Sequence, residues 1–542
     1  MKGTGSYAAL LTVFALPAIG AEPVDLAMIN RIVDEGLNHS ELAQTAAYLT
    51  DRIGGRMTNS PQMREAERWT QERYRAWGLE DVRREGFEFG RGWSIDSVSV
   101  RMTAPRPVAL RAIPIAWTPA SHGTLTAGIV VAPMARERDF ERWRGRLRNR
   151  IVLVTRPDEG SEPDAIPFER YSPQRLLQSD VFEQPVHPSL LLVKYGRERA
   201  FLAKRDAFLA AEGALAWVQM SRRDGGLLHG QGYGHRVDQT PALPGIEIAA
   251  EDYRRLARLA IAGAEPKMAI ESNVRFHDED RNAYNVLVDI PGRDGKAGYV
   301  MAGAHLDSWV ASDGAQDDAA GCAVVMESAR ILAKLGARPR RAIRFALWAG
   351  EEQGSLGSLD YIQRHLATRP PVTDARLKGI APGYTWATRW PIQRLAGHAQ
   401  LSAYFNIDNG SGRVRGLYAE GNLAVIPIFQ DWLAPFASLG ATEVAAAPTG
   451  GTDHVGMQAV GIPAFQFIQD PLDYLSRVHH SSADSYDHLK IEDLRQAAVI
   501  LASVLWMSAE RSEPLPRMPI PVQPAPTNPF DYADDEEVQG ED

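Results

Sequence analysis

Cysteine is almost absent from this chain: Cys322 is the only one among 542 residues. A single cysteine cannot form an intrachain disulfide, so the fold must be stabilised by its hydrophobic core or by bound metal. The thiol of Cys322 is expected to fill space in the core rather than to act as a nucleophile.

The sequence also lacks the basic, aromatic-rich runs of a nucleic-acid surface. Lysine and arginine number 59 and aspartate and glutamate number 68, which gives a formal net charge of −9. No run of lysine or arginine is interleaved with aromatic residues. We therefore do not expect nucleic acid as a partner.

Long apolar runs are scarce, and the one that stands out lies at the N-terminus. The segment MKGTGSYAALLTVFALPAIGAEP has an early Lys2, an apolar stretch from Ala8 to Leu16 and then small residues. This layout predicts a signal peptide over residues 1–21, because the stretch is too short to span a bilayer comfortably. An uncleaved membrane anchor is the alternative, which the helix-breaking Pro17 disfavours. We predict a secreted or periplasmic protein with no stable membrane insertion after cleavage.

The rest of the chain divides by texture into four segments. With 44% hydrophobic residues the chain can bury at least one large core, and its length suits two or three domains. Residues 22–95 carry helical periodicity, residues 96–278 carry short β-like runs, and residues 279–511 alternate strands and helices. This alternation predicts an α/β fold with a mainly parallel central sheet flanked by helices, interrupted by a separately folded insert. The Pro-rich, acidic tail at 512–542 is predicted to be disordered.

Residues of metal-ligand type follow the predicted strands of the segment 279–511. In open α/β sheets, binding sites form at the carboxyl ends of the strands. The runs that supply these residues are GYVMAGAHLDSW with His305 and Asp307, DGAQDD with Asp317 and Asp318, ALWAGEE with Glu351 and Glu352, AYFNID with Asp408, and SRVHH with His479 and His480. Each has an ordinary explanation when taken alone, such as a helix-capping aspartate or a hydrogen-bonded histidine. Their joint occurrence just beyond successive strands predicts one shared site.

These motifs resemble those of the zinc-dependent exopeptidases with two co-catalytic metal ions, and among them the carboxypeptidase Q-like branch. The matching runs are GAHLDSW, GAQDD, LWAGEEQGSLGS, NIDNGSG, GGTDHVGMQAVGIPAF and HHSSAD. The resemblance covers most of residues 30–510 and implies the zinc exopeptidase fold, a metallopeptidase that acts on peptide substrates, and two zinc ions per chain. The insert, with FERWRGRLRNRIVLVTRP and LPGIEIAAEDYRRLARLAIAG, resembles a protease-associated domain.

The resemblance implies a ligand for every position of a two-metal site. Asp317 would bridge the two ions, with His305 and Asp408 completing one site and Glu352 and His480 the other. Three carboxylates against two divalent ions leave one positive charge, which a bridging hydroxide, the nucleophile of the hydrolysis, would neutralise. The electrostatics agree with the implied ligand set.

The same resemblance implies catalytic roles for three further residues. If the chain leaves strand geometry at the glycine before them, Glu352 can bind metal while the adjacent Glu351 acts as general base. Asp307 would hold the second ring nitrogen of His305. Many relatives have a tyrosine where this chain has His479, and we expect this histidine to donate the same hydrogen bond to the oxyanion, a surface histidine being the alternative.

Several choices stay open. Aminopeptidase, carboxypeptidase and dipeptidase differ in the terminus that the pocket captures, and an amide or amino-acid-conjugate hydrolase is a further option. A single-zinc glutaminyl-cyclase-like acyltransferase and an inactive receptor or scaffold are rival functions on the same fold, and the presence of all five ligands argues against the inactive scaffold. Residues 369–399 form a longer connection than a tight αβ loop, which is typical of lids and substrate walls. A homodimer is also left open.

Overall fold

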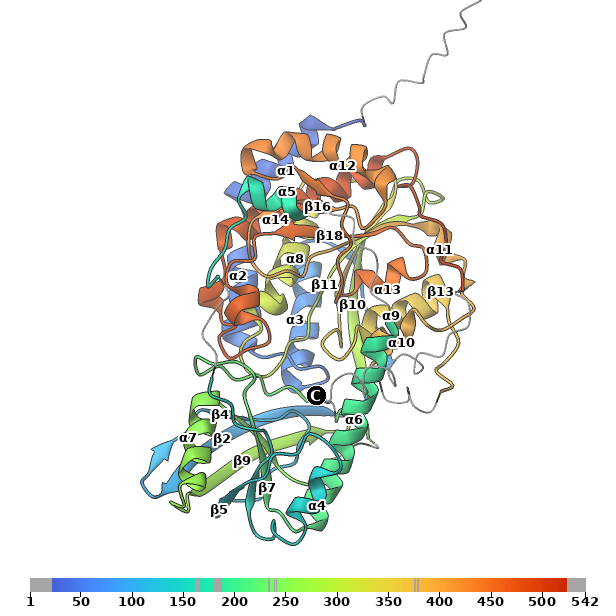
Figure 1. The fold of residues 1–542 in the computed structure, drawn as a ribbon. Helices are drawn as coiled ribbons and strands as arrows, with labels where there is room; N and C mark the ends of the chain where they lie inside the picture. Colours follow the sequence, from blue (N-terminus) through green and yellow to red (C-terminus); the bar gives the residue numbers. More distant parts are fainter. Residues whose placement is uncertain are drawn as a thin grey trace, which may run out of the picture.

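Two bodies, each built on an eight-stranded sheet, make up the chain (Figure 1). The computed structural model describes residues 22–160, 166–179, 188–232, 234–237, 239, 241–374, 377 and 380–523. The larger body contains both the N-terminal and the C-terminal parts of these residues, and the smaller body is formed by strands from the intervening segment.

The sheet of the larger body has the strand order β1-β10-β12-β11-β15-β18-β16-β17. Its strands are β1 (Glu80–Glu88), β10 (Asn282–Ile290), β12 (Ala342–Trp348), β11 (Tyr299–His305), β15 (Leu401–Asn406), β18 (Ala464–Gln469), β16 (Val414–Tyr418) and β17 (Glu443–Ala445). The central strands β12, β11, β15 and β18 run parallel, whereas β1 and β10 on one side and the β16/β18 pair on the other are antiparallel. The predicted α/β fold is confirmed, with a parallel centre and antiparallel strands on its flanks.

Helices cover both faces of this sheet, which explains why every residue of β11 is buried. Val300 and Ala302 of β11 pack toward one face and Met301 toward the other, in the two-residue alternation of a strand. The first face is covered by α1 (Leu26–Asn38), α2 (Leu42–Ala47), α3 (Pro61–Ala76), α8 (Ala320–Lys334), α12 (Ile426–Leu433) and α14 (Ile491–Glu510). The second face is covered by α9 (Leu356–Tyr361), α10 (Pro382–Trp386) and α13 (His454–Gln458), and α11 (Gly397–Gln400) precedes β15.

The smaller body has its own sheet, with the strand order β3-β2-β9-β5-β6-β7-β8-β4. Its strands are β2 (Gly92–Ala104), β3 (Val108–Ala109), β4 (Ala112–Pro114), β5 (Leu125–Val131), β6 (Ile151–Leu153), β7 (Ala216–Met220), β8 (Gly245–Ile248) and β9 (Lys267–His277). Helix α7 (Ala250–Ile261) packs on one face, while α4 (Asp139–Trp143) and α6 (Pro188–Ala211) lie on the other. This sheet begins at Gly92, inside the segment that we expected to belong to the larger body as far as residue 95.

One segment of the expected insert leaves the smaller body. Residues 166–179, with α5 (Pro173–Ser179), lie against the larger body (Figure 1). Arg170 pairs there with Asp470 at 3.1 Å and with Asp493 at 2.7 Å. The two bodies are therefore connected by more than the crossings of the chain at β2 and β9.

Of the two ends of the chain, the structure describes only the beginning of the C-terminal tail. The predicted signal peptide and residues 524–542 lie outside the described residues. The described beginning of the tail packs on the larger body, where Leu515 is 2% exposed and Arg517 donates to the carbonyl oxygen of His398 at 3.0 Å. Disorder from residue 512 onward was therefore too broad an expectation. Among the helices of the described ranges, none has the length and apolar character needed to cross a membrane.

Candidate metal centre

The predicted ligands lie where the central parallel strands end. Strand β11 ends at His305, and Asp408 and Glu352 follow the ends of β15 and β12. Asp317 lies in the turn that leads into α8, and His480 lies in the loop before α14. The topology of the sheet therefore brings together all five residues that the sequence predicted as ligands.

Asp317 lies between two pairs that each consist of an imidazole and a carboxylate. Its Oδ1 is 3.3 Å from Nε2 of His305, which is 3.5 Å from Oδ1 of Asp408. Its Oδ2 is 3.1 Å from Nε2 of His480, which is 3.0 Å from Oε2 of Glu352. The two oxygens of one carboxylate thus face different pairs, which is the arrangement that a carboxylate needs to bridge two cations.

Carboxylates at this site are buried without full compensation. The side chains of Asp317, Glu352 and Asp408 are 5%, 2% and 8% exposed. Oε1 of Glu352 is buried and has no hydrogen-bond partner in the described part of the chain. Burial of a carboxylate is costly unless a cation or a hydrogen-bond donor compensates it. The residues present therefore fit divalent cations.

The pKa shifts of the same carboxylates reflect their crowding. Burial raises the pKa of Glu352 to about 7, and the charge of His480 opposes this shift only in part. Burial and the charge of Asp408 raise the pKa of Asp318 well above its usual range. Burial also acts on Asp317, but the neighbouring imidazoles hold its pKa well below its usual value. Bound cations would favour the ionised form of all these groups.

Ligand-type atoms at the site fall into two close groups. Within each group the atoms lie within 4.8 Å of one another, and the groups are His305, Asp318 and Asp408, and Asp317, His479 and His480. Asp318 and His479 are additions to the predicted ligand set. The carboxylate of Asp318 accepts hydrogen bonds from the N–H groups of Gly321 at 2.8 Å and His305 at 3.2 Å. Its oxygens are therefore occupied in holding the start of α8 against the end of β11.

Asp307 joins the two loops that carry the ligands. Its carboxylate accepts hydrogen bonds from the N–H groups of Glu351 at 3.2 Å and Glu352 at 3.3 Å and from the hydroxyl of Thr58 at 2.8 Å. Nδ1 of His305 lies 2.9 Å from the carbonyl oxygen of Asp307 and 3.8 Å from its carboxylate. Asp307 thus lies against the second ring nitrogen of His305 through its backbone carbonyl, because its carboxylate is engaged by the next loop.

The turn after β12 separates the two adjacent glutamates. Gly350 has a φ of +72°, a left-handed conformation that favours glycine, so the chain leaves strand geometry there. Glu352 pairs with His480, whereas Glu351 forms no ion pair with either ligand histidine in the described chain and lines the adjoining cavity. Burial, followed by the charges of neighbouring carboxylates, raises the pKa of Glu351 well above its usual range.

His479 stacks on His480, with their ring centroids 3.7 Å apart. Its Nε2 is 3.9 Å from Oδ2 of Asp317, and its side chain is 32% exposed. Burial lowers the pKa of His479 to about 4. Near neutral pH its ring is uncharged and keeps one N–H that can donate a hydrogen bond into the site.

The smaller body also reaches this site, which sequence reasoning missed. Nε2 of Gln231 lies 2.8 Å from Nδ1 of His480. Leu228 and Ser482 exchange hydrogen bonds, in which the Ser482 N–H donates to the Leu228 carbonyl at 2.7 Å and the Leu228 N–H donates to the Ser482 hydroxyl at 3.1 Å. These partners are far apart in the sequence, and no local motif marks them.

Asp484 is a second supporting residue that sequence reasoning did not single out, although it lies in the quoted run HHSSAD. Its carboxylate accepts hydrogen bonds from the N–H groups of Gln316 at 2.6 Å and Asp317 at 3.2 Å. Burial raises its pKa to about 8, and the charge of Asp317 contributes to the shift. Asp484 therefore anchors the turn that carries the central ligand.

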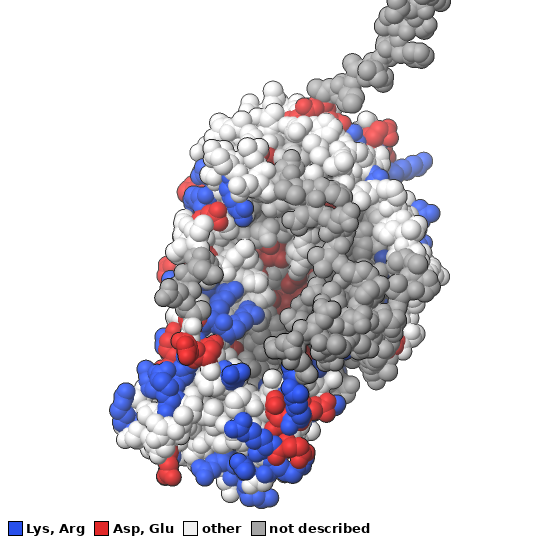
Figure 2. Space-filling view, in the orientation of Figure 1, with Lys and Arg blue, Asp and Glu red and all other residues white. Residues whose placement is uncertain are grey.

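A cavity of about 550 Å³ ends on the ligand residues. One wall is formed by residues 381–387 from the long connection, including Tyr384 and Trp386, and another by Arg199 and Arg236 of the smaller body. Figure 2 shows acidic side chains deep in this hollow and basic side chains at its rim, next to the smaller body. A cavity of this kind suits the activation of water and the polarisation of a carbonyl group, so the site is that of a metal-dependent hydrolase.

Comparison with known proteins agrees with this class. Residues 285–505, which contain every predicted ligand, match peptidase family M28. Carboxypeptidase Q of Bos taurus is 25% identical over 472 residues, which cover 87% of this chain and 86% of the bovine one. Carboxypeptidase Q of Homo sapiens is 24% identical over the same length. The protein is a metallopeptidase, and its match to peptidase family M28 spans residues 285–505.

Solved structures support the fold over nearly the whole chain. A peptidase M28 precursor from Shewanella amazonensis SB2B has a TM-score of 0.63 at 22% identity, and the match covers 92% of this chain and 98% of that one. BSAP, a zinc aminopeptidase from Bacillus subtilis, has a TM-score of 0.55 at 18% identity and coverage of 87% and 95%.

Proposed function

We propose that this protein is an exopeptidase that holds two zinc ions and hydrolyses peptide bonds near a chain terminus. The observation that carries the proposal is the position of Asp317, whose two oxygens lie 3.3 and 3.1 Å from the imidazoles of His305 and His480. One ion would be held by Asp317, His305 and Asp408, and the other by Asp317, Glu352 and His480. Three carboxylates supply three negative charges against four positive ones, which suits a site that must attract an electron-rich carbonyl.

Zinc, when bound, would supply Lewis acidity and lower the pKa of water in the site. Glu351 lines the cavity and belongs to neither proposed ligand set. We assign to it the transfer of the proton from the attacking water to the leaving amine. The uncharged ring of His479 lies beside the central ligand and would donate a hydrogen bond to the carbonyl oxygen as negative charge develops there.

The supporting residues fix these groups before substrate arrives. Asp307 holds the backbone of both glutamates and, through its carbonyl oxygen, the ring of His305. Gln231 holds the ring of His480. If Nε2 of His480 held a metal ion, Nδ1 would carry the proton and would donate to the amide oxygen of Gln231 after a flip of the amide, whose nitrogen faces Nδ1 in this structure.

The organisation of the chain is part of this proposal. The smaller body, whose sheet begins at Gly92, would be a protease-associated domain inserted into a peptidase domain formed by the preceding residues from 22 onward and by residues 279–511. A signal peptide at 1–21 would direct the protein to the periplasm or the exterior. The separate sheet of the smaller body supports the division.

Metal content and substrate range, measured together, test the proposed function. The purified protein should contain two equivalents of zinc, lose hydrolysis in 1,10-phenanthroline and regain it on addition of zinc. Aminoacyl-amides, N-blocked peptides and free dipeptides assayed side by side identify the terminus that is captured. One equivalent of zinc together with cyclisation of an N-terminal glutamine would instead support the acyltransferase, and hydrolysis of none of these substrates by the zinc-loaded protein would reject the peptidase.

A further inference from the structure

An arginine of the smaller body shares the reaction cavity with the metal centre. Arg236 lies between β7 and β8 and lines this cavity together with Arg199 of α6. The other end of the same cavity is lined by Asp317, Glu351 and Glu352. A single cavity therefore joins cationic side chains of one body to metal-ligand carboxylates of the other.

Within the described part of the chain, no ion pair neutralises the positive charge of Arg236. Its side chain is partly buried, and within the described residues its guanidinium takes part in no ion pair or hydrogen bond. Arg223, in the same segment of the smaller body, behaves differently and donates to the carbonyl oxygen of His479 at 3.0 Å. Arg223 thus has a structural partner, whereas the donors of Arg236 are free for a ligand.

His235 shows that the potential at this wall is positive. Its imidazole stacks on Phe89 with ring centroids 4.7 Å apart. Burial lowers the pKa of His235 to about 3, and the charges of Arg236 and Arg199 act in the same direction. No carboxylate raises the pKa of His235. An anionic ligand at this wall would therefore be attracted by the two arginines without opposition from a carboxylate beside His235.

The cationic region continues beyond the reaction cavity. Arg236 also lines a neighbouring cavity of about 700 Å³, together with Arg281, Arg369 and Arg389. Arg369 is 3% exposed, and Nε of Arg369 and of Arg389 are buried without a hydrogen-bond partner among the described residues. The wall that Arg236 belongs to therefore carries several donors that the protein itself leaves unused.

We propose that Arg236, assisted by Arg199, binds a carboxylate of the peptide substrate and thereby determines specificity. This inference rests on the proposed exopeptidase function, because it assumes that the scissile carbonyl lies at the metal centre. The planar guanidinium offers N–H donors in a fork that matches the two oxygens of a carboxylate. The substrate is then a short peptide whose anionic group lies on the side of the smaller body, either a free C-terminus or an acidic side chain.

Binding measured in a protein that cannot turn over tests the proposal without interference from hydrolysis. The Glu351→Gln protein, loaded with zinc, is titrated by calorimetry with Ala-Ala, Ala-Ala-amide and Ala-Glu-amide, and the titrations are repeated after adding Arg236→Gln. Hydrogen bonds between charged groups are strong enough that the loss should be about 10- to 100-fold in Kd for the peptide carrying the recognised carboxylate. Ala-Ala-amide should change less than about twofold.

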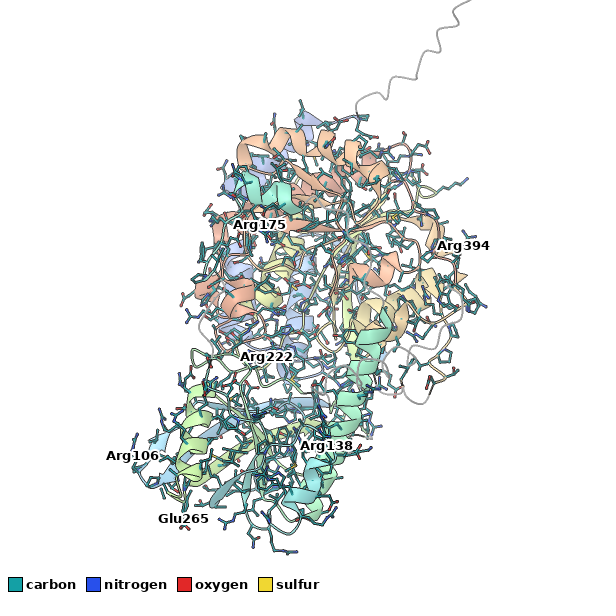
Figure 3. All side chains as sticks on the ribbon, viewed as in Figure 1. Arg106, Arg138, Arg175, Arg222, Glu265 and Arg394 are labelled. Atoms are coloured by element: carbon teal, nitrogen blue, oxygen red, sulfur yellow. The ribbon has the colours of Figure 1, made fainter. Side chains whose placement is uncertain are left out.

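The three peptides distinguish the source of the carboxylate. A loss confined to Ala-Ala identifies the free C-terminus, and a loss for Ala-Glu-amide identifies an acidic side chain. Arg236→Lys should retain part of the affinity, since the charge remains. Arg106→Gln removes an exposed arginine at the far end of the smaller body and serves as the control (Figure 3). Zinc content and thermal midpoint establish that each variant is folded.

Equal losses for all three peptides, or no loss for any, would overturn the role of Arg236. Hydrolysis is also measured with enzyme that retains Glu351. This measurement distinguishes failure of the carboxylate site from failure of the proposed exopeptidase function. If the enzyme hydrolyses none of the peptides while the selective binding persists, the exopeptidase assignment fails and the carboxylate site stands. If hydrolysis proceeds and Arg236→Gln changes neither the preference for Ala-Ala over Ala-Ala-amide nor that for Ala-Glu-amide over Ala-Ala-amide, the carboxylate site alone is rejected.

Discussion

At the scale of single residues, the adjacent glutamates show how one backbone turn separates two functions. Glu352 lies 3.0 Å from His480 through Oε2, and Glu351 faces the cavity without joining a ligand pair. The left-handed Gly350 makes this possible, because successive side chains of a continuing strand would point to opposite faces. Substitution of Glu351 should therefore lower the turnover rate, whereas substitution of Glu352 should weaken zinc binding.

Glu351→Gln keeps the size and hydrogen-bonding capacity of the side chain but removes the proton acceptor. The turnover rate on the best peptide substrate should fall by about 10²- to 10⁴-fold. Zinc content should stay at the wild-type value, because Glu351 is not a ligand. Rate and zinc equivalents are measured on the same preparation, with the exposed Glu265→Gln on the smaller body as the matched control (Figure 3). Loss of zinc from Glu351→Gln would show that ligand and base have been assigned in reverse.

Glu352→Gln replaces an anionic ligand by a neutral amide. One of the two zinc ions should then leave at a chelator concentration at which the wild type keeps both, and the thermal midpoint should fall, since the ion binds only the folded state. Chelator titration with metal analysis measures the first effect and thermal unfolding the second. Retention of both ions at wild-type affinity would exclude Glu352 as a ligand.

The residues that lie together at the candidate site could be singled out from the sequence, because each follows a recognisable strand or lies in a short motif. The residues that hold them in place could not. Thr58, Gln231 and Asp484 contact the site from segments far from their partners in the chain, and each is an ordinary polar residue in its local context. Such contacts are fixed by tertiary packing, which periodicity and motif spacing do not encode.

At the scale of elements, the loop between β7 and β8 of the smaller body contacts the candidate metal centre. It is docked by paired hydrogen bonds between Leu228 and Ser482 and reaches His480 through Gln231. The smaller body therefore does more than cover the cavity, since one of the ligand histidines is oriented from it.

Gln231→Ala should weaken zinc binding at the His480 side by about 10- to 100-fold, as is usual when the hydrogen-bond partner of a metal-ligating histidine is removed. The other ion should keep its affinity. Competition with a chromogenic chelator resolves the two affinities, and the exposed Gln174→Ala is the control. Equal weakening of both ions would mean that the substitution loosens the docking of the two bodies and does not act through His480.

The alternation of strands and helices in 279–511 was a sound basis for predicting the central sheet, because β11 and its neighbours are buried on both faces. The flanking strand β1 and the segment 166–179 were harder to predict. β1 comes from the N-terminal segment and pairs antiparallel with β10, and residues 166–179 leave the smaller body to pair with Asp470 and Asp493. Both depend on long-range pairing, for which local sequence carries no signal.

At the scale of the whole molecule, His235 links the two bodies through a group that must stay uncharged. Its ring stacks on Phe89, which follows β1, and its carbonyl oxygen accepts a hydrogen bond from the N–H of Arg91 at 2.8 Å. Burial lowers its pKa from 6.5 to about 3. The unfolded chain thus binds this proton at a higher pH than the folded one does.

The lowered pKa of His235 makes the folded protein less stable in acid. Above pH 6.5 His235 is unprotonated in both the folded and the unfolded state. As the pH falls from 6.5 toward about 3, the unfolded state binds a proton at His235 and the folded state does not. The free energy of unfolding therefore decreases. At about pH 5 this loss amounts to about 2 kcal/mol for this one group.

His235→Phe retains an aromatic ring at the junction and removes the titration. The advantage of the wild type over His235→Phe in free energy of unfolding should therefore shrink by about 2 kcal/mol between about pH 7.5 and about pH 5. Acid also protonates the metal ligands, but that loss is common to both proteins and cancels in the difference. Unfolding is measured at both pH values, with the exposed His39→Phe as the control. A difference between wild type and His235→Phe that is independent of pH would show that His235 is free to take up a proton in the folded protein and that the junction between the two bodies opens in acid before the chain unfolds.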